Sequence, residues 1–133
     1  MREFVVRMAN RPGRLAALTE ALAACGVNIE ALAVYGHDGE GTTRLIVKEP
    51  TTARRVLEEA ALSFEEHPVL TAHMPHRPGE LARLTRSLAD SQVNIDALYM
   101  LHSSAGGVEL AVSVDQPDWA VPHLEVKGGT LSE

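Results

Sequence analysis

The chain opens with alternating side-chain character and then changes to a helical spacing. Phe4, Val6 and Met8 stand at every second position, which predicts a strand because successive side chains of a strand point to opposite faces. Apolar residues then recur three or four positions apart, which predicts a helix with one buried face. This stripe consists of Leu15, Leu18, Leu22 and Cys25, and Gly26 is expected to end the helix.

Further segments complete the first half of the chain. Residues 29–35 are apolar on both faces, which predicts a central strand covered on both sides. A glycine-rich hairpin loop is expected at 36–41, with a return strand at 42–48. Thr51 or Thr52 is expected to cap a second helix, and a short strand at 62–66 to follow it. The inward residues of that helix are expected to be Ala53, Val56, Leu57 and Ala60, and its solvated residues Arg54, Arg55, Glu58 and Glu59.

A segment of the first half recurs almost intact in the second half. Residues 10–32 match 76–98 at a constant offset, so no residue is gained or lost between the two motifs of each copy. One motif is an Arg-Pro-Gly loop at the helix start, and the other is a Val-Asn-Ile turn after the helix. A long period that is present twice predicts two copies of one small domain, at 1–67 and 68–133.

The second copy repeats the pattern less cleanly. Leu81, Leu84 and Leu88 repeat the helix stripe, residues 95–101 repeat the doubly apolar strand, and 108–114 form the return strand after a turn at Ala105-Gly106-Gly107. The first copy is therefore the better guide to the fold of both.

The end of the second copy departs furthest from the first. The repeat slips by about one residue before Pro117, which best matches Pro50. Pro122 falls inside the expected second helix, where a proline removes a hydrogen bond and clashes with the preceding turn. Gly128-Gly129 and the polar residues 130–133 predict a frayed tail. We therefore expect a stunted last helix and a weak or absent last strand.

Composition and charge narrow the class of protein. The chain has 133 residues, of which 45% are hydrophobic and 23% charged, as is typical of a globular protein. A formal charge of −6 without a Lys/Arg-rich tract argues against nucleic acid and anionic membranes as partners. Cys25 is the single cysteine, expected to be an inert core thiol, and no apolar run is long enough to span a bilayer or to act as a secretory signal. These features favour a cytoplasmic location.

Two units in the order strand, helix, strand, strand, helix, strand, each with the Arg-Pro-Gly loop and the Val-Asn-Ile turn, resemble tandem ACT domains. The resemblance is strongest over 2–65 and 68–115. It implies an α+β fold of two ferredoxin-like βαββαβ units, with antiparallel sheets and helices on one face, the second unit being truncated at its last helix and strand. It also implies a regulatory role, because ACT domains are small-molecule regulatory modules that most often bind amino acids at an interface between two copies.

The two motifs also have the chemistry that a free amino acid needs. A helix N-terminus offers unpaired N–H groups and a positive dipole end to a carboxylate. Gly13 and Gly79 lack a Cβ, so a ligand can approach the backbone closely there. The resemblance assigns ligand contacts to Asn10 with Asn28, and to the matching His76 with Asn94. The full candidate set is Asn10, Arg11, Pro12, Gly13, Asn28, Ile29, His76, Arg77, Pro78, Gly79, Asn94 and Ile95.

Two departures from the family bear on the ligand. His76 stands where the family prefers Asn or Asp, so the second site is expected to bind differently or not at all. Met8 and Met74 stand where some serine-binding members have His, which argues against serine as the ligand.

Structural roles compete with ligand binding at the same positions. Asn10 could instead cap the following helix, with Pro12 in the first turn of that helix. Asn28 and Asn94 could instead be turn residues that tolerate unusual backbone angles. Histidines 67, 73 and 76 suggest a metal site, but no cysteine or paired carboxylate stands nearby at ligand spacing. We therefore expect neither a metal nor another cofactor.

The function classes can be ranked on these observations. The sequence has neither a Gly-x-Ser-x-Gly motif nor a phosphate loop, and aromatic residues make up 4% of it, few for stacking on RNA bases. We expect an amino-acid-binding sensor, not an enzyme, that forms a homodimer and holds its ligand at an interface between ACT units. The second hypothesis is a regulatory subunit of an amino-acid biosynthetic enzyme such as acetolactate synthase. The third is an acylphosphatase-like enzyme, which would use Arg11 with Asn28 and shares the βαββαβ order.

Overall fold

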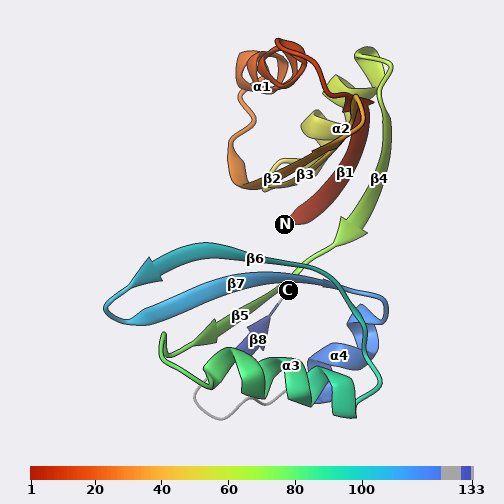
Figure 1. Ribbon diagram of the computed structural model, residues 1–133. Coiled ribbons are helices and arrows are strands. Elements are labelled where there is room, and N and C mark those ends of the chain that lie inside the picture. The colour runs from red at the N-terminus through yellow and green to blue at the C-terminus, as the bar shows by residue number, and fades with distance from the viewer. Residues whose placement is uncertain (124–129, 133) are drawn as a thin grey trace. The chain divides into compact units, whose positions relative to one another are not determined.

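The chain divides into two compact units, Met1–His67 and Pro68–Glu133. The computed structural model describes residues 1–123 and 130–132. Each unit combines helices with an antiparallel sheet (Figure 1). The expected α+β fold with the order strand, helix, strand, strand, helix, strand is therefore confirmed in both units.

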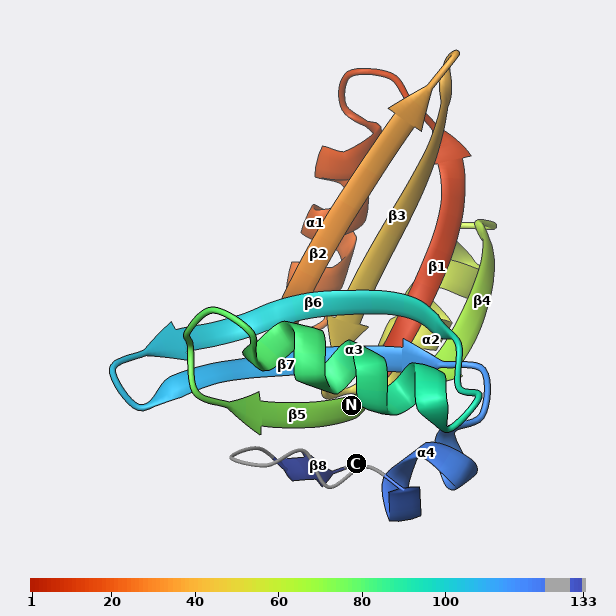
Figure 2. The ribbon, with the colours of Figure 1, turned by 60° about the horizontal axis from the view of Figure 1, so that its bottom comes forward.

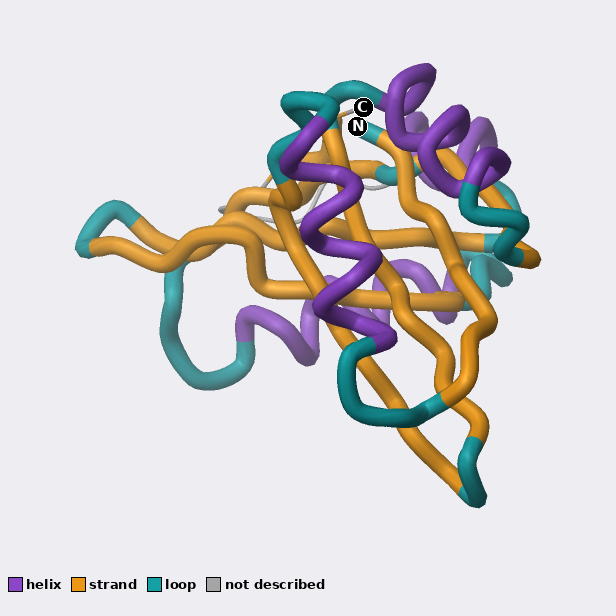
Figure 3. The backbone as a smooth tube through the Cα atoms, turned by 90° about the horizontal axis from the view of Figure 1, so that it is seen from above, coloured by secondary structure: helices purple, strands orange, loops and turns teal. Residues whose placement is uncertain are grey.

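Unit 1 contains two helices and a four-stranded sheet of order β2-β3-β1-β4. Its helix α1 lies along one face of the sheet (Figure 3). The elements are β1 Arg2–Ala9, α1 Arg14–Ala24, β2 Ile29–His37, β3 Glu40–Val47, α2 Pro50–Glu59 and β4 Ser63–Pro68.

Unit 2 repeats this topology with the strand order β6-β7-β5-β8. Its helix α3 lies along one face of its sheet (Figure 2). The elements are β5 Leu70–Met74, α3 Glu80–Asp90, β6 Ile95–Ser104, β7 Gly107–Val114, α4 Pro117–His123 and β8 Thr130–Ser132.

Each unit has a hydrophobic core of its own between the helices and the sheet. In unit 1 the predicted strand residues Phe4 and Val6 pack with Leu18 and Leu22 of α1, because the period of two and the helical period bring both sets to one side. In unit 2 the matching cluster includes Leu70, Ala72, Leu84 and Leu88.

The second helix and last strand of unit 2 are shorter than those of unit 1, as expected. Helix α4 has 7 residues against 10 in α2, and β8 has 3 residues against 6 in β4. The expected fraying of the tail is wrong for residues 130–132, which pair with β5. Gly128 and Gly129 lie outside the described residues.

The apolar strands β2 and β6 are edge strands among the described residues, so the prediction that they are central is wrong. That both of their faces are covered stays a prediction. Leu32 and Val34 are each 43% exposed, and Tyr35 is 60% exposed. In β6, Met100 is 55% exposed. A strand that is apolar on both faces and also ends the sheet leaves apolar side chains and unpaired backbone groups open to a partner.

The β2–β3 hairpin turns more tightly than the glycine-rich segment predicts. Asp38 and Gly39 alone form the turn, with φ angles of 50° and 79°. Positive φ at both positions matches the two-residue type I′ turn, whose twist agrees with that of the flanking strands. Strands therefore occupy much of the expected loop.

The slip between the two copies lies in the β6–β7 hairpin, earlier than Pro117. Phe4 pairs with Leu45, whereas its repeat Leu70 pairs with Val112, one residue further along than the repeat predicts. The register of β6 shifts between Met100 and His102, which accommodates the extra residue as a bulge.

Helix α2 begins and ends differently from the prediction. Its N-cap is Glu49 and Pro50 is in its first turn, where the missing N–H costs nothing, so neither Thr51 nor Thr52 caps it. Ala60 is the C-cap and is exposed instead of buried, because the helix ends before it.

Arg54 of α2 keeps 39% of its side chain exposed and also forms an ion pair. It donates to both carboxylate oxygens of Glu66 on β4, at 2.7 and 2.9 Å, and Arg2 of β1 donates to the same carboxylate at 2.8 Å. The hydrogen bonds from Arg54 hold the pKa of Glu66 below its ordinary value of 4.5, although burial opposes them. This cluster ties α2 to two strands of unit 1.

The lowered pKa of Glu66 predicts acid sensitivity of unit 1. A carboxyl whose pKa is lower in the folded state stabilises the fold fully above its unfolded pKa, and this contribution is lost as the pH falls through the folded pKa. We expect Glu66→Gln to lower the free energy of unfolding at pH 7 and to match the wild type in strong acid. Urea unfolding of both proteins between pH 7 and pH 2 measures this difference, and a difference that does not change with pH would contradict the assignment.

Candidate functional site

The loop between β1 and α1 holds the first candidate motif of unit 1. Gly13 is the N-cap of α1 and has a φ of 90°, which an L side chain rarely adopts. Pro12 therefore precedes the helix instead of standing in its first turn. No side chain caps α1, so the alternative role of Asn10 as a helix cap is wrong. The first N–H groups of the helix stay available to an anionic group.

Asn10 instead lies against the β2–β3 hairpin. Its backbone N–H donates to the carbonyl of Gly39 at 2.9 Å. A Cβ on Gly36 would collide with the Asn10 amide nitrogen, and one on Gly41 would lie 3.5 Å from the Asn10 Cβ. Because Gly36 and Gly41 have no side chains, the hairpin leaves room for the Asn10 side chain.

This packing predicts a coupling between Asn10 and Gly36. We expect Gly36→Ala to displace the Asn10 amide and to cost about 1 kcal/mol or less of stability, because the amide is the movable end of a side chain. Asn10→Ala should relieve the collision, so the double variant should be more stable than the sum of the two single changes predicts. Urea unfolding of the four proteins measures the coupling, and strict additivity would show that the two residues do not interact.

Unit 2 repeats the backbone of this loop. Gly79 is the N-cap of α3 with a φ of 92°, and α3 also has no side-chain cap. His76, Arg77 and Pro78 are exposed. The loop borders a hollow of about 450 Å³ whose lining includes Leu81 and Met100.

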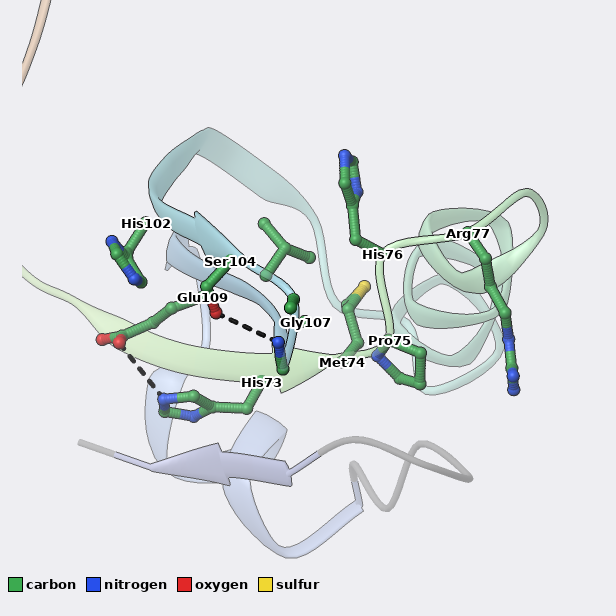
Figure 4. A pocket seen from close by; sticks show the side chains of 12 residues that line it. His73, Met74, Pro75, His76, Arg77, His102, Ser104, Gly107 and Glu109 are labelled. Atoms are coloured by element: carbon green, nitrogen blue, oxygen red, sulfur yellow. Dashed lines mark hydrogen bonds and ion pairs between the residues drawn. The ribbon is translucent and has the colours of Figure 1, made fainter.

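The His76 side chain (Figure 4) is oriented differently from that of Asn10, which lies against the hairpin of its unit. The hairpin of unit 2 borders a hollow of about 860 Å³. Of the side chains that line it, His73 points toward Glu109, whereas His76 points away from both (Figure 4). The Nε2 atom of His73 lies 3.2 Å from a carboxylate oxygen of Glu109. Among the described residues, no three His, Cys, Asp or Glu side chains come close enough together to hold a metal ion.

The asparagine side chain of the second motif has the same kind of partner in both units, and the backbone of Asn94 is also hydrogen-bonded to Asp115. The Asn28 amide donates to the Glu30 carboxylate at 3.3 Å, and the Asn94 amide donates to the Asp96 carboxylate at 3.2 Å. Both asparagines are exposed. Neither has a positive φ; that conformation belongs to Gly26, at 75°, and to the matching Gln92, at 61°. The alternative that these asparagines serve unusual backbone angles is therefore wrong.

Two residues of the candidate set also serve the cores. Ile29 packs against the core of unit 1, and Ile95 packs against that of unit 2. Both are half-buried, so each positions the asparagine before it.

The two motifs of one unit do not come together. Asn10 lies beside the tip of the β2–β3 hairpin, whereas Asn28 directly precedes the first residue of β2 (Figure 2). Strand β2 has nine residues and is about 30 Å long, since a strand rises about 3.3 Å per residue. A small ligand cannot touch both motifs of the same unit, and Arg11 cannot act together with Asn28 there.

Three side chains depart from the predicted helix stripes. Cys25 is exposed because α1 ends at Ala24, so it is not a core thiol. Leu81 is 48% exposed, while Glu80 beside it is 2% exposed. Glu80, Leu84 and Leu88 share the inward face of α3 at a spacing of four residues. The prediction is wrong only in the first residue of the stripe, where Glu80 is buried in place of the apolar Leu81.

In the part of the chain that the structure describes, none of the helices has the length and apolar character that crossing a membrane requires.

The family comparison concerns unit 1. The ACT domain family matches residues 3–61 of the chain, which is most of that unit. No curated protein matches the chain at a significant level.

Solved structures resemble the chain over both units. A protein from Bacteroides thetaiotaomicron is 25% identical, with a TM-score of 0.85 over 98% of this chain and 90% of that one. The ligand-free regulatory subunit of aspartate kinase from Thermus thermophilus is 17% identical, with a TM-score of 0.68 over 92% of this chain and 87% of that one. The corresponding subunit from Thermus flavus is also 17% identical, with a TM-score of 0.63 over 92% and 89%. The last two are similar in fold alone.

Proposed function

Because unit 1 is an ACT domain and unit 2 repeats its fold and both of its loop motifs, we propose that this tandem ACT-domain protein binds an amino acid and acts as a regulatory sensor, not as an enzyme. One observation carries the proposal. Asn28 and Asn94 are exposed, have the same side-chain geometry in both units, and occupy backbone conformations that do not require asparagine. An exposed amide that the fold does not need is suited to both ends of a zwitterion.

The ligand site is composite. A free amino acid is much shorter than β2, so a ligand that touches both motifs takes the Arg-Pro-Gly loop from one ACT unit and the Val-Asn-Ile turn from another. We assign the loop residues Asn10–Gly13 and 76–79, with the turn residues 28–29 and 94–95, to such interfaces. Binding there would change how ACT units pack, which is the difference in affinity between two states that regulation requires.

A second copy of the chain is the proposed source of such an interface. Edge strands β2 and β6 present apolar side chains, including Leu32, Tyr35 and Met100. Exposed apolar edges of this kind favour pairing with another chain. A homodimer is therefore part of the proposal, and sedimentation equilibrium tests it.

An enzyme subunit is the alternative partner for the same edges. Two similar structures are regulatory subunits of aspartate kinase, and a regulatory subunit of an amino-acid biosynthetic enzyme, such as acetolactate synthase, would use the same ligand chemistry. Co-purification with a larger enzyme would favour this alternative. The acylphosphatase-like hypothesis loses its support, because Arg11 and Asn28 lie at opposite ends of unit 1.

Thermal unfolding with each of the twenty amino acids at millimolar concentration tests the proposal. A ligand at about 100 times its dissociation constant stabilises the folded state by about 2.7 kcal/mol, which shifts the midpoint measurably. We expect at least one amino acid to do so. If none raises the midpoint at saturating concentration, the motifs are structural and the proposed function is wrong.

A further inference from the structure

A buried carboxylate lies at the start of α3, where it lines the hollow of about 450 Å³ described above, here called the hollow of unit 2. Glu80 is 2% exposed. One of its oxygens, Oε1, accepts from Arg77 at 2.8 Å and from Arg83 at 3.5 Å. The other oxygen, Oε2, is shielded from solvent and has no hydrogen-bond partner among the described residues. A buried polar atom without a partner costs free energy that a suitable donor would recover.

Apolar side chains dominate the hollow that Glu80 lines. Its walls include Met74, Val108 and Leu110 from the sheet, and its rim includes Leu81 and Met100, about half of each being exposed. Leucine and methionine side chains on a rim can move aside for a ligand, since methionine in particular adapts its shape. The hollow thus has mostly apolar walls, and the carboxylate that lines it has one oxygen, Oε2, that is buried without a partner among the described residues.

The matching place in unit 1 has the opposite charge. Arg14 takes the position of Glu80 and is exposed. The buried carboxylate is therefore a property of unit 2, where His76 also replaces Asn10.

From these observations we propose that the hollow of unit 2 selects an α-amino acid with an apolar side chain, and that Glu80 Oε2 accepts a hydrogen bond from the ligand's ammonium group. The inference rests on the proposed function and specifies the ligand class at one of its sites. The apolar side chain lies against Leu81 and Met100. The ligand's carboxylate faces the uncapped N-terminus of α3, where Gly79 allows close approach.

Calorimetric titration with two probes tests this assignment. L-Leucine has the ammonium group, and 4-methylpentanoate has the same carbon skeleton without it. We expect the wild-type chain to bind leucine about ten-fold or more tightly than 4-methylpentanoate, since a hydrogen bond to a charged group is worth at least that ratio. Glu80→Gln keeps the shape of the side chain and should reduce the ratio to near one.

Matched variants separate the site from general effects on the fold. Arg14→Gln changes the corresponding position of unit 1 and should leave the ratio unchanged. Met100→Trp fills the hollow from its rim while Glu80 itself is unchanged, and it should abolish leucine binding there. If Glu80→Gln does not fold, the affinity ratio of the wild type and the loss of leucine binding in Met100→Trp still test the assignment.

Three results would overturn the assignment: equal binding of the two probes to the wild type, an unchanged ratio in Glu80→Gln, or no binding of leucine. None of them contradicts the proposed function if a different amino acid stabilises the chain through Asn28 or Asn94. Failure of all twenty amino acids to stabilise the chain would overturn both.

Discussion

Asn28→Ala and Asn94→Ala should each weaken amino-acid binding by about ten-fold or more. Each change removes an exposed amide that we assign to the ligand, and hydrogen bonds to a charged group are worth about 1.5–3 kcal/mol. The effect on folding should be small, because neither asparagine has the backbone angles that require it and both are exposed. Titration of the stabilising amino acid into each variant measures the change.

Glu30→Ala and Asp96→Ala are the matched controls. Each removes the carboxylate that accepts the asparagine amide within its own turn, at 3.3 and 3.2 Å. If the asparagines act on the ligand, the controls should keep most of the affinity. If the controls weaken binding as much as the asparagine variants do, then the turn itself is what matters and the side chains do not contact the ligand.

Leu22→Ala and Leu88→Ala should each lower the free energy of unfolding of their own unit by about 2–5 kcal/mol. They are matched positions of the repeat, with exposures of 0% and 1%, and each belongs to the core of its unit. Replacing a buried leucine by alanine removes apolar contacts and leaves a cavity, which accounts for an effect of this size. The loss of unfolding free energy should have the larger effect on unit 2, since the described parts of its last helix and strand are short.

Hydrogen exchange resolved by peptide assigns each loss to a unit. Leu22→Ala should speed exchange chiefly in residues 1–67, and Leu88→Ala chiefly in 68–133. Leu81→Ala is the control on the same helix, and because Leu81 is 48% exposed it should cost about 1 kcal/mol or less. A cost for Leu81→Ala as large as that for Leu88→Ala would contradict the observed face of α3.

The repeat and the two hydrophobic periods predict the fold well. A period of two at residues 4–8 and a helical period at 15–22 determine which side of each element is buried, and the recurrence of both predicts a second unit. Pro122 predicts a short last helix in unit 2, and α4 spans 7 of the described residues. What such patterns cannot express is the place of a strand in the sheet. Strand β2 is apolar on both faces, yet it is an edge strand. Apolar side chains indicate that a face is to be buried, but they do not identify the element or chain that buries it.

Errors of one residue account for the missed side chains. The stripe of the second copy is wholly apolar when it starts at Leu81, but the inward face of α3 starts at Glu80. The signal in the sequence is the spacing of four residues between Glu80 and Leu84, which places both side chains on one face of a helix. Cys25 fits the spacing of the first stripe but follows the last residue of α1, so its exposure depends on where the helix ends.

The location of the site depends on distances that sequence does not contain. The Arg-Pro-Gly loop and the Val-Asn-Ile turn are close in the chain but separated by the length of a strand, β2 in unit 1 and β6 in unit 2. Their chemistry could be predicted from the residue types; that a ligand contacting both needs two units of this fold follows from the length of the strand that separates them.

Amide chemical shifts of the isotope-labelled chain, recorded with and without the amino acid that raises the unfolding midpoint most, test the central claim most directly. With a composite ligand site, we expect the largest shift changes on one of the Arg-Pro-Gly loops, 10–13 or 76–79, and on one of the turns, 28–29 or 94–95. Changes centred on α2 or β4, or no changes at saturating ligand, would contradict it.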